Sequence, residues 1–402
     1  MNSQATNTIG KLHQIQDMLI GLVENLNEQQ FKTHYVAGMG SPGWYLGQAV
    51  YLETYLIREV MQHDADMTAR VRHFFDIGIE PDAAISDQLP PKEHLLNWAL
   101  ELQEDNLTRL ANPSIFGNNP KLDPDWLATY LLQRHAISYE NMLILLQGKA
   151  IAEDNGMHMV TMELLAETDS IESVLISQGH YRIGARDEEI TFDIEKPAQM
   201  VELANFRIAT KPVSNANYLA FMNDGGYENP AFWTKQGWQW RQTFNISHPW
   251  HWKKNPNGRW YEINILGAAD LPPDEPVMGI SQYEASAFSQ WLAKHHEKFQ
   301  GAVLQHEYQW ETAARQGALQ MTGRAREWCS NDFDLYPGYQ QPDDITISLN
   351  NNKNGKVIKG LSLHSQPSIR RMSLRKAADA GNQHLLTGVR LVFPPGKPFW
   401  EQ

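Results

Sequence analysis

The sequence predicts an α+β chain in two parts, a bundle of four helices followed by a domain of short strands and long loops. Three observations indicate this fold class. Apolar residues recur with helical spacing through roughly the first 150 residues. Beyond that point, Gly, Pro and Asn separate short segments of alternating apolar and polar residues. A chain of 402 residues is also long enough for two or three domains.

The first two helices of the predicted bundle are separated by turn residues. Residues 8–35 carry apolar side chains at helical spacing, and glycines and a proline interrupt the pattern between Gly38 and Gly43. The pair Ser41-Pro42 is typical of a helix start, because Pro favours the first helical position. The second helix is expected to run to about Gln62.

The last two helices follow a predicted loop over residues 77–91. One helix is expected from Pro91 to about Leu110, and another from Pro124 to about Gln147. Long amphipathic helices with short connections are typical of an up-down bundle.

The second part is predicted to mix short strands with a few helices. Residues 201–208 alternate like a strand, and helices are expected at 215–223 and 281–296, with a further helical turn at 310–315. The segment between the two helices is expected to be a long, Trp-rich loop.

We divide the chain into three segments. The bundle is assigned to residues 1–150, a connector or added hairpin to 151–190, and the second domain to 191–402.

Composition excludes some classes of partner. The net charge is -13, from 34 Lys and Arg against 47 Asp and Glu, which disfavours nucleic acid and anionic membranes as partners. The 13 Trp predict aromatic-lined cores. Cys329 is the only cysteine, so no intramolecular disulfide can form, and a cytoplasmic location is expected. We find no signal peptide and no apolar run long enough to span a bilayer.

Several motifs resemble the formylglycine-generating-enzyme-like (sulfatase-modifying-factor-like) domains. They are Asn205-Phe206-Arg207-Ile208, Pro212-Val213-Ser214, Asp224-Gly225-Gly226-Tyr227, Tyr283-Glu284-Ala285, Glu307-Tyr308-Gln309-Trp310-Glu311, Glu327-Trp328 and Gly388-Val389-Arg390. With the preceding bundle, which carries Trp44, Gly47 and Glu53, nearly the whole chain resembles the ergothioneine- and ovothiol-type sulfoxide synthases. That resemblance implies a DinB-like four-helix bundle fused to a C-type-lectin-like domain.

The resemblance also implies a non-haem iron centre, held between the domains by three histidines of the bundle. Such an enzyme uses O₂ to join a histidine derivative to a thiol, and neutral imidazoles suit Fe(II). The three ligand positions correspond here to Gln48, His135 and Tyr139. Gln is a weak ligand, and a Tyr must lose a proton with a pKa of about 10 to bind well. We therefore predict that the iron centre is lost and expect no cofactor. We also predict that Gln48, His135 and Tyr139 form a hydrogen-bonded network in its place.

Other parts of the implied site also lack the residues that the family has there. The segment from His73 to Pro91, where the family is arginine-rich, has no Lys or Arg. The family's Asn-Trp-Asp motif falls near Lys376-Ala377-Ala378-Asp379, and no Tyr follows Tyr339. Formylglycine generation needs a pair of cysteines, so a single Cys329 excludes that reaction.

We carry three hypotheses from the sequence. The first is a family member that has lost its iron centre and C–S bond-forming reaction and keeps an interdomain ligand pocket, as a pseudo-enzyme or as a regulatory or partner subunit. The second is an active O₂-dependent synthase, with iron(II) at a rebuilt site that recruits His364, His384 or Asp379. The third is a lectin-like module whose loops 340–356 and 373–384 recognise a partner.

The ligand-binding candidates are residues of the implied site and of the basic cluster near the C-terminus: Ser138, Trp328, Arg371, Arg375 and Asp379. The expected partners are a histidine-like or thiol-like small molecule, and a protein partner or a second copy of the chain.

Overall fold

The computed structural model describes residues 3–76, 78–79, 81–117, 122–168, 170–343, 348–349 and 355–395. The chain divides into two compact units. The helical unit comprises Met1–Glu153 and Ser365–Ile369, and the mixed unit comprises Asp154–His364 and Arg370–Gln402. Each unit has its own buried core. Residues 344–347 and 350–354 of the predicted partner-binding loop lie outside the described residues.

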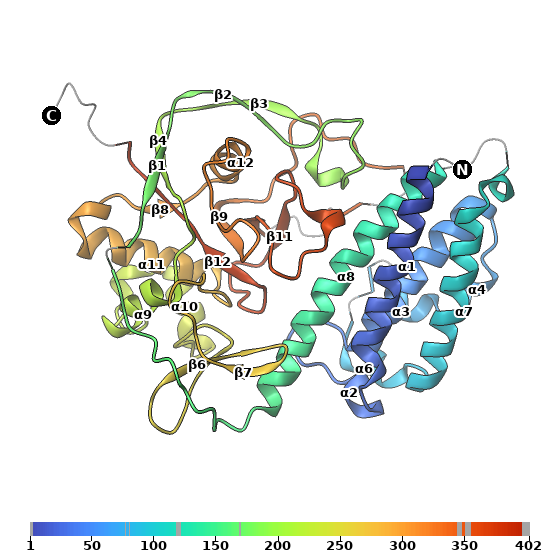
Figure 1. Ribbon diagram of the computed structural model, residues 1–402, viewed down its shortest axis with the longest axis horizontal. Coiled ribbons are helices and arrows are strands. Elements are labelled where there is room, and N and C mark those ends of the chain that lie inside the picture. The colour runs from blue at the N-terminus through green and yellow to red at the C-terminus, as the bar shows by residue number, and fades with distance from the viewer. Residues whose placement is uncertain are drawn as a thin grey trace. The chain divides into compact units, whose positions relative to one another are not determined.

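Four long helices form the helical unit. They are α1 (Ser3–Glu24), α3 (Pro42–Thr54), α7 (Lys92–Ala111) and α8 (Pro124–Glu153). The shorter elements are α2 (Glu28–Lys32), a π-helical turn η1 (Tyr55–Val60), α4 (Asp66–Ala69), α5 (Arg72–Phe75), α6 (Ala83–Gln88), η2 (Pro113–Phe116) and η7 (Pro367–Ile369). The four long helices run side by side and pack on one another (Figure 1). Four packed helices were expected, whereas their assignment as a DinB-like bundle stays a prediction.

Cap residues explain where the helices begin. The Ser41 side chain accepts a hydrogen bond from the Trp44 N–H at the start of α3, with Pro42 at the first helical position. Two predictions were wrong for the same reason. The expected helix over 8–35 is interrupted because Asn27 forms a capping box that starts α2. The expected loop 77–91 contains α6, because the Asp82 side chain accepts from the Ile85 N–H.

Gly47 allows the helices to approach closely. A Cβ atom at this position would lie 2.2 Å from the Phe75 ring of α5. Phe75 is fully buried in the core of the helical unit, beside Trp44, Leu46 and Val50. The glycine of the Trp44-to-Gly47 motif is therefore required by packing.

The mixed unit combines short strands with helices. Its helices are α9 (Asn215–Asn223), α10 (Lys235–Thr243), α11 (Gln282–His295) and α12 (Glu307–Arg315), with 3₁₀ turns η3 (Asp193–Glu195), η4 (Pro230–Phe232) and η5 (Glu297–Phe299). Its strands are β1 (Ser173–Ile176), β2 (Gly179–Ile183), β3 (Gln199–Leu203), β4 (Phe206–Ala209), β5 (Trp252–Lys254), β6 (Trp260–Asn264), β7 (Gly267–Ala269), β8 (Val303–Leu304), β9 (Arg326–Asp332), β10 (Lys356–Lys359), β11 (Lys376–Ala378), β12 (Thr387–Val389) and β13 (Leu391–Phe393). The class of mixed helix and sheet is as predicted.

The strands form small sheets. Two four-stranded sheets have the orders β1-β4-β13-β8 and β11-β10-β9-β12, and β2-β3 and β5-β6-β7 form smaller ones. The predicted strand 201–208 is two strands, since β3 pairs with β2 and β4 pairs with β1 and β13. The predicted Trp-rich loop also holds α10 and the three strands β5 to β7. Its Trp252 is fully buried and packs in the core of the unit.

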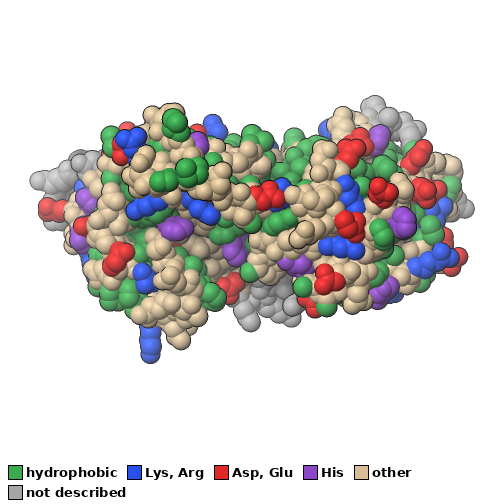
Figure 2. Space-filling view, turned by 90° about the horizontal axis from the view of Figure 1, so that it is seen from below, with side chains coloured by type: hydrophobic (Ala, Val, Ile, Leu, Met, Phe, Trp, Pro, Cys, Tyr) green, Lys and Arg blue, Asp and Glu red, His purple; other side chains and the backbone are tan. Residues whose placement is uncertain are grey.

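The surface carries charges of both signs. On the face drawn in Figure 2, Lys and Arg side chains lie beside Asp and Glu side chains rather than gathering in one patch. Among the described helices, none is long and apolar enough to cross a membrane.

Candidate functional site

The helical unit buries three polar side chains from three different helices at one point. Gln16 of α1, Glu53 of α3 and His135 of α8 are each exposed by 1% or less. His135 Nε2 lies 3.0 Å from Glu53 Oε2, and the Gln16 amide Nε2 donates to the same oxygen at 2.8 Å. The Glu53 carboxylate therefore holds the His135 ring in place.

This geometry corrects the predicted network of Gln48, His135 and Tyr139. Gln48 lies on α3 and Tyr139 on α8, and both are half-buried. The His135 ring bonds to Glu53 instead of to either of them. A carboxylate is a stronger hydrogen-bond acceptor than an amide or a phenol, which explains the choice of partner. Burial raises the pKa of the Tyr139 phenol, so the proton that a metal would have to displace is held more tightly.

Two oxygen atoms of this cluster have no partner among the described residues. They are Oε1 of Glu53 and Oε1 of Gln16, and both are buried. Each belongs to a group whose other polar atom takes part in the Gln16–Glu53 hydrogen bond. A buried acceptor without a donor costs free energy, and a bound water molecule or cation would supply the missing partner.

The residues at the three family ligand positions do not fit a three-histidine iron centre. His135 is the only imidazole, and its Nε2 is engaged with Glu53. Within the described part of the chain, no three His, Cys, Asp or Glu side chains are grouped so that they could hold a metal ion. Ser138, another predicted site residue, lies half-buried on α8.

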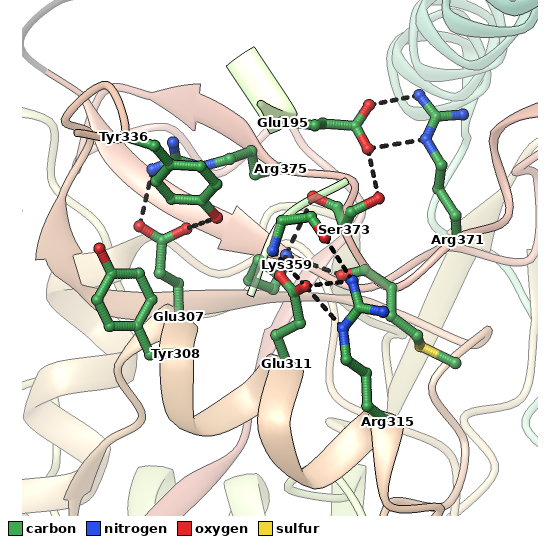
Figure 3. A network of polar contacts seen from close by, with 12 residues as sticks. Glu195, Glu307, Tyr308, Glu311, Arg315, Tyr336, Lys359, Arg371, Ser373 and Arg375 are labelled. Atoms are coloured by element: carbon green, nitrogen blue, oxygen red, sulfur yellow. Dashed lines mark hydrogen bonds and ion pairs between the residues drawn. The ribbon is translucent and has the colours of Figure 1, made fainter. Parts of the chain in front are cut away.

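The predicted basic candidates of the mixed unit are held by buried acids (Figure 3). Arg375 is 1% exposed, donates to Glu307 at 2.7 Å, and lies between the rings of Phe333 and Tyr336. Arg371 Nε donates to Glu195 at 2.8 Å, and its Nη2 donates to the other carboxylate oxygen. Both guanidinium groups therefore have a carboxylate partner within the unit.

The other two candidates of the mixed unit differ in burial. Trp328 is fully buried and its Nε1 donates to the Ile280 carbonyl at 2.8 Å. Asp379 is exposed and accepts from the Gly381 N–H at 2.8 Å in a turn after β11.

Figure 3 also shows a buried ion pair that sequence reasoning did not single out. Lys359 and Glu311 are both fully buried and 2.8 Å apart, and Arg315 donates to the other oxygen of Glu311. Burial works against ionisation of Glu311, but the charges of Lys359 and Arg315 outweigh it and lower its pKa. Cys329 is buried, and burial raises the pKa of its thiol, which disfavours the reactive thiolate.

A second polar network joins two of the sequence motifs. The Tyr227 hydroxyl donates to Glu284 Oε1 at 2.5 Å, and Gln383 Nε2 donates to both oxygens of Glu284 at 2.8 and 2.9 Å. Tyr218 shares a hydrogen bond of 2.9 Å with Tyr227. Without a cation beside it, burial raises the pKa of Glu284 to about 7. The Asp-Gly-Gly-Tyr and Tyr-Glu-Ala motifs thus have a shared structural role, which the motifs alone did not reveal.

Part of the mixed unit is similar to a known protein family. Residues 161–320 match the family described as the sulfatase-modifying factor enzyme 1-like domain. This stretch of the mixed unit is therefore similar to such a domain.

Curated relatives extend the similarity. The chain is 28% identical over 272 residues to a hercynine oxygenase of Mycolicibacterium smegmatis, which is 55% of this chain and 61% of that protein. It is 36% identical over 142 residues to the hercynine oxygenase of Mycolicibacterium thermoresistibile, covering 35% of this chain and 29% of that protein. It is 27% identical over 193 residues to the formylglycine-generating enzyme of Thermomonospora curvata, covering 42% of this chain and 60% of that protein. The chain thus matches less than two thirds of the length of each of these relatives.

Proposed function

We propose that this chain is a sulfoxide-synthase-like protein that lacks the three-histidine iron centre and does not join a histidine derivative to a thiol. It would act as a ligand-binding pseudo-enzyme, or as a regulatory or partner subunit. Its similarity to hercynine oxygenases supports the relationship. The observation that carries the proposal is the hydrogen bond from His135 to the buried Glu53 carboxylate.

The donor set at the three family positions supports the same conclusion. Fe(II) sites of this kind need several neutral imidazoles, and here Gln48 and Tyr139 stand at two of the three positions. An amide oxygen is a weak ligand, and the raised pKa of Tyr139 disfavours the phenolate that would bind iron.

An oxygen-consumption assay tests the loss of the reaction. Purified protein is supplied with Fe(II), hercynine and a thiol such as cysteine, and dissolved oxygen is followed with an electrode. We expect no consumption above that of Fe(II) without protein. Oxygen uptake that requires the protein and both substrates, with sulfoxide product in the mass spectrum, would contradict the proposal.

The orphan oxygens favour a second candidate, a rebuilt metal site. Glu53 Oε1 and Gln16 Oε1 are buried acceptors beside His135, and a divalent cation accepts Glu, Gln and His as ligands. Thermal unfolding with and without added Mn²⁺, Fe²⁺ or Zn²⁺ separates the two candidates. A metal-dependent rise in the melting temperature that disappears in Glu53→Gln would favour the rebuilt site, and no rise would favour the first proposal.

A further inference from the structure

A small polar cavity lies in the mixed unit, where the ladder between β1 and β4 ends. The last paired residues of this ladder are Ser173 and Ala209. Next to this pair lies a cavity of about 130 Å³, lined by residues 170–172, residues 209–214, Asn217 and Asp274. All of these residues belong to the mixed unit.

Hydrogen bonds fix the walls of the cavity. Asn217 of α9 is buried, and its Nδ2 donates to the Glu167 carbonyl at 2.9 Å and to Ser170 Oγ at 3.0 Å. The Thr210 N–H donates to the Glu172 carbonyl at 2.9 Å, and the Asn215 N–H donates to the Glu275 carbonyl at 2.9 Å. The three chain segments are therefore tied together, and the cavity is formed before any ligand arrives.

Three charged side chains line this cavity. Glu172, Lys211 and Asp274 are exposed, and among the described residues none of them forms an ion pair. Two carboxylates favour a cationic group on a ligand, and the Lys211 ammonium favours an anionic group. The charges thus match a ligand that carries both signs.

Part of the cavity wall is apolar, and the cavity shares lining residues with a larger hollow. Ile171 and Val213, both buried, line the small cavity. Ile171, Glu172 and Thr210 also line an open hollow of about 710 Å³, whose other lining residues include the charged Arg207, Glu297 and Lys298 and the largely buried rings of Phe299 and Phe393. A ligand with its charged groups in the small cavity therefore has the exposed edges of these two rings as apolar surface for its side chain.

We propose that this cavity binds a small zwitterion, namely an α-amino acid with an apolar or aromatic side chain. Its ammonium group meets Glu172 and Asp274, and its carboxylate meets Lys211. The side chain extends toward Phe299 and Phe393. This site is separate from the Gln16–Glu53–His135 cluster, so its occupancy does not depend on whether the chain binds iron.

Three probes of similar shape test the proposal by isothermal titration calorimetry on the full chain. L-Phenylalanine carries both charges, 2-phenylethylamine carries only the ammonium group, and 3-phenylpropionate carries only the carboxylate. We expect L-phenylalanine to bind most tightly. Absence of binding at millimolar L-phenylalanine, or equal affinities for all three probes, would overturn the proposal.

Charge-removing variants assign the contacts. Lys211→Met should weaken L-phenylalanine and 3-phenylpropionate about fivefold and leave 2-phenylethylamine unchanged, since an exposed ionic contact contributes about 1 kcal/mol. Asp274→Asn and Glu172→Gln should weaken L-phenylalanine and 2-phenylethylamine and spare 3-phenylpropionate. The matched control Glu188→Gln removes an exposed carboxylate outside the cavity and should change nothing. Binding that is unaffected by all three cavity variants would contradict the assigned site.

Discussion

Glu53 of the helical unit and Glu311 of the mixed unit are two fully buried carboxylates with opposite surroundings. Glu311 has donors on both oxygens, the Gly184 N–H and Arg315 on one and Lys359 on the other. Glu53 has two donors on one oxygen and none among the described residues on the other. Both oxygens of Glu311 are satisfied, whereas Glu53 keeps an oxygen that has no hydrogen-bond donor among the described residues.

The largest expected effect comes from removing the charge of Glu311. Glu311→Gln leaves Lys359 as a fully buried cation without its carboxylate partner. Breaking a buried pair in this way should lower the unfolding free energy by about 3–5 kcal/mol. Urea unfolding, followed by the fluorescence of the Trp-rich mixed unit, measures the loss. Exposed ion pairs contribute up to about 1 kcal/mol. A loss of unfolding free energy below that value would show that the Lys359–Glu311 pair does not hold the core together.

Glu284 extends the comparison to a buried carboxylate whose donors among the described residues are all neutral. The folded protein holds its proton up to about pH 7, and the unfolded chain releases it near pH 4.5. The unfolding free energy should therefore fall as the pH rises from about 4.5 to about 7, by about 3 kcal/mol, and then level off.

Glu284→Gln should remove this part of the pH dependence, because the side chain no longer titrates. Denaturant unfolding of both proteins across this pH range gives the difference. The exposed Glu188→Gln should keep the decline seen in the parent protein. A decline of equal size in Glu284→Gln would assign it to other groups.

Gly47→Ala tests the packing of α3, the helix that carries Glu53. The new methyl group would lie 2.2 Å from the Phe75 ring, and relieving that overlap should cost about 1–3 kcal/mol. Gly10→Ala is a matched control, since no atom lies within 4 Å of its Cβ and alanine favours a helix. The two melting temperatures should move in opposite directions. If Gly47→Ala is as stable as the parent protein, α3 and α5 do not approach each other as closely as the structure shows.

Glu53→Gln should give the smallest loss and so the sharpest contrast with Glu311→Gln. Glu53 has no Lys or Arg partner among the described contacts, and its donors are an amide and an imidazole. Replacing it should change the unfolding free energy by only about 1 kcal/mol, the value of an ordinary hydrogen bond. The same urea titration measures it. A loss as large as that of Glu311→Gln would mean that the two carboxylates have the same structural role.

Elements with clear caps and an apolar face could be predicted from the sequence. The helices α7, α9 and α11 lie close to their predicted ranges of 91–110, 215–223 and 281–296. Helix α10 was missed because its sequence shows no clear apolar periodicity, and in the structure Gly237 is its only buried residue. Helix α6 was missed because it has six residues and depends on the cap from Asp82.

The polar sites were less accessible to sequence reasoning. His135 was singled out through the family motif, but its partner Glu53 is 82 residues away, and Gln16 is a further 37 residues from Glu53. No local pattern relates positions at such separations. Arg371 and Arg375 were chosen for their charge, and only the structure reveals the buried acids Glu195 and Glu307 that pair with them.

The iron content of the purified protein decides whether the three-histidine centre has been lost. The protein and the variant Gln48→His/Tyr139→His, which restores imidazoles at the two altered family positions, are loaded with Fe(II) without oxygen, desalted, and analysed by mass spectrometry of the metal. We expect almost no iron in the parent protein and a substantial gain in the variant, because the missing imidazole donors are what prevents binding. Close to one iron per chain in the parent protein would contradict it.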